Sequence, residues 1–142
     1  MDLKKLKMVS IAIIILASCA GLRSSAAPSS DLIKIRATCY CEHGLTYSGY
    51  YTREGIIAGR KEDIGKVAAI YEVAEDGSVG DFIGYFEFLD CGAGFDTDGD
   101  GKGDSTIRGE TIDVFRDDMD GVKNWIKLHG DYVYMKVINC EG

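Results

Sequence analysis

Three features are missing from this 142-residue chain, and each absence excludes a class of protein or site. After residue 18 there is no cluster of Lys and Arg, and the net charge of the chain is −7, which argues against nucleic-acid binding because that requires neutralised phosphates. No apolar run is long enough to cross a bilayer of roughly 30 Å. The histidines, His43 and His129, have no partners at metal-ligand spacing, so both are predicted to be surface residues.

The N-terminal segment has the pattern of an export signal. Three lysines precede an apolar run at residues 8–17. Residues 16–19, Leu-Ala-Ser-Cys, resemble a lipobox, in which cleavage precedes a lipid-carrying cysteine. We therefore predict a lipoprotein-type signal peptide at residues 1–18 and contact with the membrane only through a lipid anchor at Cys19.

Ordinary cleavage, after Ala20 or within residues 24–27, is the alternative, and it would give a secreted protein. Removal of residues 1–18 leaves 13 Lys and Arg against 22 Asp and Glu. Residues 19–30 are small and polar enough for a flexible tether. Residues 31–142 then have the size of one domain, which we expect to be a monomer.

Four cysteines remain in this domain: Cys39, Cys41, Cys91 and Cys140. An even number in an exported protein predicts two disulfides. Of the three possible connectivities, one that joins Cys39 to Cys41 is disfavoured because the two share one face of a predicted strand. Of the other two, we favour Cys41–Cys91 with Cys39–Cys140. A zinc site is the other interpretation, but the two CxxC knuckles typical of one are missing. Free thiols are expected if the source lives without oxygen.

The domain pattern is mainly β. Short apolar runs bounded by glycine and turn residues predict strands, and a single segment has helical spacing. The predicted strands are 32–41, 55–59, 67–73, 82–89, 111–115 and 131–138, and the helix is 119–128 with an apolar face of Met119, Val122, Trp125, Ile126 and Leu128. This pattern predicts a small barrel with one short helix, with a sandwich as the alternative.

Carboxylates gather in the segment 86–118. Asp90 and Asp113 each stand in or at the end of a predicted strand, where a side chain can be held rigidly. Between them lies an Asp/Gly-rich tract with the spacing of a calcium loop. Its predicted ligands are Asp96, Asp98, Asp100, the carbonyl of Lys102, and Asp104. Ile107 occupies the position where an EF-hand has a bidentate Glu, so the tract is closer to other extracellular DxDxDG loops. A flexible acidic loop is the alternative.

The order of motifs resembles the 3D domain, a double-psi β-barrel module named for three aspartates. The module occurs in murein lytic transglycosylases of the MltA type and in resuscitation and stationary-phase proteins. The matching segments are Ala37-Thr38-Cys39-Tyr40-Cys41, Thr46-Tyr47-Ser48-Gly49, Gly55-Ile56-Ile57-Ala58, Asp63-Ile64-Gly65, Asp90-Cys91-Gly92-Ala93, Ile107-Arg108-Gly109 and Ile112-Asp113-Val114-Phe115, with Asp117 four residues after Asp113. The chain departs from the pattern at Cys91, where threonine is usual, and in the tract that lengthens the spacing between the first two aspartates.

The resemblance implies a six-stranded double-psi barrel that cleaves peptidoglycan glycan strands as a lytic transglycosylase. Asp113 would be the acid/base, Asp90 its neighbour and Asp117 a supporting group, while Thr46, Tyr47 and Ser48 would bind sugar. No cofactor is needed for this chemistry, and Ca²⁺ would be structural. Asp117 could equally serve the start of the predicted helix. Two other functions stay open: a non-catalytic glycan-binding barrel and a calcium-stabilised structural lipoprotein.

Overall fold

The computed structural model describes residues 31–92 and 104–139, which belong to the unit Asp31–Gly142. The described chain is mainly β, as the sequence predicts. Its elements are β1 (Ile33–Tyr40), β2 (Ile56–Gly59), the 3-10 turn η1 (Lys61–Asp63), β3 (Val67–Val73), β4 (Val79–Cys91), β5 (Thr111–Phe115), α2 (Met119–His129) and β6 (Tyr132–Ile138). Every predicted strand and the predicted helix are present.

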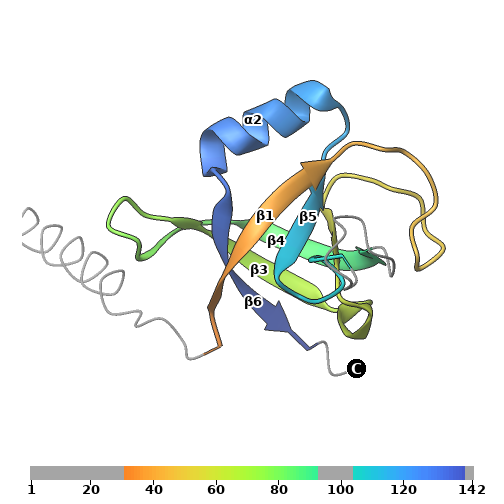
Figure 1. Ribbon diagram of the computed structural model, residues 1–142, viewed down its shortest axis with the longest axis horizontal. Coiled ribbons are helices and arrows are strands. Elements are labelled where there is room, and N and C mark those ends of the chain that lie inside the picture. The colour runs from red at the N-terminus through yellow and green to blue at the C-terminus, as the bar shows by residue number, and fades with distance from the viewer. Residues whose placement is uncertain (1–30, 93–103, 140–142) are drawn as a thin grey trace, which may run out of the picture. The chain divides into compact units, whose positions relative to one another are not determined.

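The six strands form one mixed sheet in the order β1-β5-β2-β4-β3-β6 (Figure 1). Strands β1 and β5 run parallel, as do β2 and β4. The other neighbours are antiparallel, and β6 pairs with β1, so the sheet closes on itself. In this closed sheet each of the six strands has a hydrogen-bonded neighbour on both sides.

Strand β4 begins three residues earlier than expected because the hairpin before it is tight. The carboxylate of Asp76 accepts hydrogen bonds from the N–H and hydroxyl of Ser78. Gly77 adopts φ 83°, a conformation that glycine allows at little cost. The chain therefore reverses at once, and Val79 already pairs with Val73 of β3.

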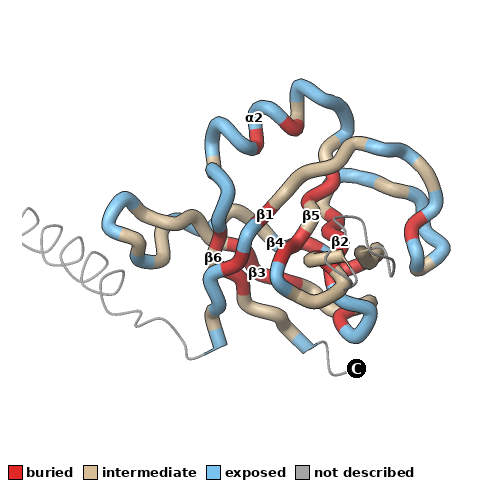
Figure 2. Tube along the Cα trace, in the orientation of Figure 1, coloured by how far each residue is buried: buried red, intermediate tan, exposed pale blue. Residues whose placement is uncertain are grey.

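The core lies inside the closed sheet, and Figure 2 shows buried positions along its strands. Its members are aliphatic and aromatic side chains from all six strands and from helix α2. The main cluster consists of Ile35, Ala37, Ile57, Ala68, Ile70, Phe86, Phe88, Ile112, Val114, Trp125, Val133 and Met135. Burial of this apolar surface is the principal force that holds the strands in register.

Helix α2 covers the sheet through a narrower stripe than its sequence predicts. Of the five expected apolar residues only Val122 and Trp125 are buried, while Met119, Ile126 and Leu128 are 47–61% exposed. Figure 1 shows the helix above the strands, joined to the upper end of β6. None of the helices in the described ranges is both long and apolar enough to cross a membrane.

The predicted Cys41–Cys91 disulfide is not formed: Cys39, Cys41 and Cys91 are free thiols. Strands β5 and β2 lie between β1 and β4, whereas a disulfide joins Cα atoms only about 4.4–6.8 Å apart. Burial, and then the charge of Asp113, raise the pKa of the Cys39 thiol to about 12, so it stays protonated. Cys140 lies outside the described residues.

Candidate active site

Residues that pair across four neighbouring strands position the two candidate carboxyls, Asp90 and Asp113. Thr38 on β1 is the partner of Asp113 on β5, and Asp113 is the partner of Ala58 on β2. Ala58 is also the partner of Asp90 on β4. Residues directly opposite one another share a face of the sheet. Asp113 and Asp90 therefore flank the same alanine although 23 positions separate them in the sequence.

The small side chain of Ala58 leaves space between the two carboxyls. Two strand spacings separate their backbones, which is about 10 Å, and a methyl group fills little of that interval. A cavity of about 420 Å³ opens there, within the range typical of ligand sites. Its lining residues are Tyr40, Glu42, His43, Gly44, Leu45, Thr52, Ala58, Asp90, Gly92, Asp104, Thr106 and Asp113.

Asp113 is the most perturbed carboxyl of this cavity. Burial raises its pKa from 3.8 to about 6, since a charged group loses hydration there. The negative charges of Asp104, Asp90 and Glu42 act in the same direction. The hydroxyl of Thr38 lies 3.0 Å from Oδ1 of Asp113 and opposes them by donating a hydrogen bond. Asp113 can therefore hold a proton near neutral pH and also release it.

Asp90 is fixed by the backbone around it. Its Oδ1 accepts two N–H groups, from Tyr47 and from Cys91, each at 3.0 Å. The buried hydroxyl of Tyr40 lies nearby. Burial and the charges of Asp90 and Asp113 raise the pKa of Tyr40 well above its usual value, so the phenol stays neutral as a proton donor. Asp90 is thus held in place by hydrogen bonds, while the raised pKa of Asp113 allows that carboxyl to exchange a proton.

Asp104 joins the cavity through a close approach of two chain segments. A side chain on Gly92 would place its Cβ 2.6 Å from the backbone nitrogen of Ile107, so glycine is needed there. The carboxylate of Asp104 accepts the N–H of Thr106 at 2.9 Å, which closes a local turn. The negative charge of Asp104 therefore acts on Asp113 and helps to raise its pKa.

The predicted calcium ligands Asp96, Asp98, Asp100 and Lys102 lie outside the described residues. Within residues 31–92 and 104–139, no group of three or more His, Cys, Asp or Glu side chains is arranged to hold a metal ion. The calcium site stays a prediction. Asp104, the one described member of its set, lines the cavity.

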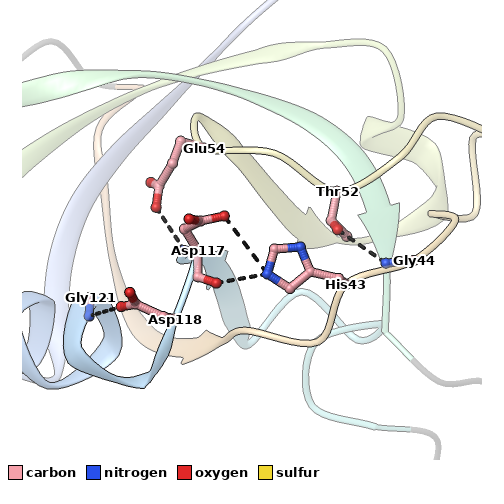
Figure 3. Close-up of polar contacts among 7 residues, drawn as sticks. All are labelled: His43, Gly44, Thr52, Glu54, Asp117, Asp118 and Gly121. Atoms are coloured by element: carbon pink, nitrogen blue, oxygen red, sulfur yellow. Dashed lines mark hydrogen bonds and ion pairs between the residues drawn. The ribbon is translucent and has the colours of Figure 1, made fainter.

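Asp117 does not line the cavity but supports a residue that does (Figure 3). Its backbone oxygen accepts a hydrogen bond from Nε2 of His43 at 2.7 Å, and its Oδ1 lies 3.7 Å from the same nitrogen. Its N–H donates to Glu54 at 2.7 Å. The ring of His43 also packs edge-on against Phe115. Asp117 is therefore placed to orient His43.

His43 is exposed, as the sequence predicts, with 58% of its side chain accessible, but sequence reasoning did not place it at the cavity. Its partner is a backbone oxygen 74 positions away, and no local spacing signals such a contact. His129 was likewise predicted to be a surface residue, but its side chain is only 16% exposed and contacts Glu72 of β3.

The predicted sugar-binding residues Thr46, Tyr47 and Ser48 lie next to the cavity and do not line it. The hydroxyl of Thr46 lies 2.8 Å from both the oxygen of Tyr50 and the hydroxyl of Ser48, and thereby closes its own loop. The N–H of Ser48 donates to Leu89 on β4 at 3.2 Å. Of the three, only Tyr47 has a mostly exposed side chain, at 61%.

Comparison with protein-family models, with curated proteins and with solved structures gave no match. The function is therefore inferred from the residues and geometry of the cavity.

Proposed function

We propose that this protein cleaves peptidoglycan glycan strands as a lytic transglycosylase, with Asp113 as the single acid/base. The observation that carries the proposal is the half-buried carboxyl of Asp113, whose pKa is raised to about 6 at the wall of a cavity that also contains Asp90. A perturbed carboxyl in a cleft is a candidate for proton transfer. Catalysis of this kind is most efficient when the pKa lies near the working pH.

The reaction needs one group that acts twice. Asp113 as a neutral acid gives its proton to the glycosidic oxygen between N-acetylmuramic acid and N-acetylglucosamine, and that bond breaks. Asp113 as a carboxylate then takes the proton of the muramoyl C6 hydroxyl, whose oxygen bonds to C1 and closes the 1,6-anhydro ring. The proton count balances and no water is consumed, unlike in hydrolases with paired carboxylates. Asp90, held by two N–H groups, supplies negative charge beside the oxocarbenium-like centre.

The finer architecture belongs to the same proposal. A closed six-stranded sheet with two parallel pairs and the order of the motifs along the chain both support a double-psi barrel. Export, with either a lipid anchor at Cys19 or secretion, is proposed from the N-terminal sequence. A glycan substrate outside the cytoplasm is consistent with that location.

Digestion of purified sacculi tests the reaction. The mature domain is incubated with sacculi, with and without calcium, and soluble products are analysed by mass spectrometry. We expect 1,6-anhydromuropeptides from the wild type and a loss of about a thousandfold in Asp113→Asn, the usual scale for a proton-transfer group. Asp81→Asn is the matched control, because Asp81 is exposed on β4 and does not line the cavity. Hydrolysis products without an anhydro ring, or equal activity of the two variants, would reject the mechanism.

Glycan binding without cleavage is the second candidate, and exposed tyrosines beside the cavity favour it. In that case sacculi would bind the wild type and Asp113→Asn equally and stay intact in both calcium conditions.

A further inference from the structure

Four large side chains stand exposed on the loop between β1 and β2, immediately beside the cavity. Leu45, Tyr47, Tyr50 and Tyr51 are 61–71% exposed, and we refer to them as the tyrosine rim. Large apolar side chains gathered on a surface commonly mark a binding site. The cavity chemistry described above makes no use of these side chains.

The rim is built on a well-connected loop. The N–H of Thr46 donates to Tyr50 at 2.8 Å and that of Gly49 to Thr46 at 3.0 Å. Leu45 and Tyr51 form an isolated β-bridge across the loop. These bonds fix the backbone that carries the tyrosines. Aromatic side chains on a preformed backbone bind with little further loss of entropy.

The rim is also continuous with the cavity. Gly44, Leu45 and Thr52, at the base of the loop, line the cavity wall. The N–H of Tyr47 reaches the carboxylate of Asp90. A polymer whose reacting bond lies at Asp113 and which leaves the cavity over this wall must pass over the rim (the loop extends beyond the strands in Figure 1).

The chemistry of the rim suits saccharide rings. Tyrosine presents a flat apolar face that can stack on the C–H face of a pyranose, and a hydroxyl that can hydrogen-bond to sugar hydroxyls. We propose that the tyrosine rim binds the part of a glycan strand that extends out of the cavity, so that the preferred ligand is a long strand and not a disaccharide. This inference rests on the proposed function and deepens it.

Binding measurements in the Asp113→Asn background test the inference without interference from cleavage. Peptide-free peptidoglycan glycan fragments, one a disaccharide and one a long strand, are titrated by calorimetry. We expect the long strand to bind more tightly, and Tyr47→Ala, Tyr50→Ala and Tyr51→Ala each to weaken it about fivefold, the scale of a lost aromatic contact. Binding of the disaccharide stays the same, and Tyr50→Phe weakens the long strand less than Tyr50→Ala does because the ring is retained.

Tyr85→Ala is the matched control, because Tyr85 has the same 65% exposure as Tyr50 but stands on β4 and does not line the cavity. An equal loss in Tyr85→Ala, or no loss in any rim variant, overturns the inference. If sacculi are cleaved but the rim variants bind normally, the proposed function stands and the rim proposal fails. If no anhydro products form but strands bind through the rim, the reaction fails and the rim proposal stands.

Discussion

Asp63 on η1 and Asp113 on β5 are two carboxyls withdrawn from solvent, and their surroundings shift their pKa values in opposite directions. Asp63 is 4% exposed, and burial alone would raise its pKa. Arg60 at 3.0 Å and Lys66 at 3.1 Å donate hydrogen bonds to it. Their effect outweighs burial and lowers its pKa. Asp113 has a neutral hydroxyl as its hydrogen-bond donor and carboxylates around it, so its pKa rises to about 6.

This difference separates a structural carboxylate from a candidate acid. Burial is common to both residues and does not distinguish them. The sign of the neighbouring charges does, since cations favour the ionised form and anions favour the protonated form. An ionised, cation-paired Asp63 ties η1 to its neighbours, whereas a proton can enter and leave Asp113.

The largest effect on stability is expected for Asp63→Asn. Loss of the charge removes two charge-assisted contacts and costs about 2–3 kcal/mol of unfolding free energy at pH 7. The value stays below that of a fully buried pair because Arg60 and Lys66 are 48% and 34% exposed and can be hydrated again. Urea titration of the wild type and of Asp63→Asn measures this loss of unfolding free energy. The lowered pKa means that wild-type Asp63 stabilises the protein above the unfolded pKa of about 3.9 and loses this effect in stronger acid. A loss that does not shrink as the pH falls below the unfolded pKa of about 3.9 would contradict the assignment.

Asp113→Asn should change the free energy of unfolding in the opposite direction and raise it at pH 7. A folded-state pKa raised from 3.8 to about 6 means that ionisation opposes folding. The penalty is absent below pH 3.8, grows up to about pH 6 and is constant above it. The full difference would correspond to about 3 kcal/mol, which partial hydration in the cavity reduces to about 1–2 kcal/mol. The variant is therefore expected to be more stable than the wild type at pH 7 and equal to it at pH 3. If Asp63→Asn and Asp113→Asn destabilised the protein equally at pH 7, the stated difference between the two carboxyls would be wrong.

A third experiment tests the hydrogen bond from Thr38 to Asp113, which lowers the pKa of that carboxyl. Thr38→Val removes the donor to Oδ1 of Asp113, so the pKa of Asp113 should rise further, by up to about one pH unit for a bond of roughly 1 kcal/mol. Titration of the carboxyl carbon by NMR measures the shift directly. The alkaline limb of the activity profile should move in the same direction. Thr38→Ser, which keeps the hydroxyl, should restore both values, and a downward shift in Thr38→Val would disprove the stated role.

The smallest effect is expected for Asp117→Asn. His43 is bound mainly by the backbone oxygen of Asp117, which the substitution keeps. The lost ion pair is exposed, with side-chain exposures of 58% and 73%. Activity on sacculi should fall by less than about fivefold, the scale of a surface ion pair. A loss as large as that of Asp113→Asn would place Asp117 in the reaction itself.

The elements of the fold could largely be predicted from the sequence, because short apolar runs between glycines leave few alternatives to strands. The burial of α2 could not, because helical spacing shows which residues share a face and not how much of that face a curved sheet covers. Trp125 was expected in the core and is 3% exposed there, whereas Leu128 is 61% exposed.

The cavity was only partly predictable. Asp90 and Asp113 could be singled out from their motifs, but their common partner Ala58 follows from strand register, which local sequence does not show. His43 and Thr38 depend on contacts over more than 70 positions. Thr46 was chosen as a ligand-binding hydroxyl, and the structure adds that this hydroxyl hydrogen-bonds within its own turn, a contact that the motif alone does not show.

The shared partner of the two aspartates also has a consequence for how such a protein can diversify. Because Ala58 pairs with both, their separation is set across the sheet and not along the chain. The number of residues between Gly92 and Asp104 therefore does not set the distance between the two aspartates. A lineage could change that number and keep both carboxyls in place, provided that Asp104, whose charge helps to raise the pKa of Asp113, stays at the cavity.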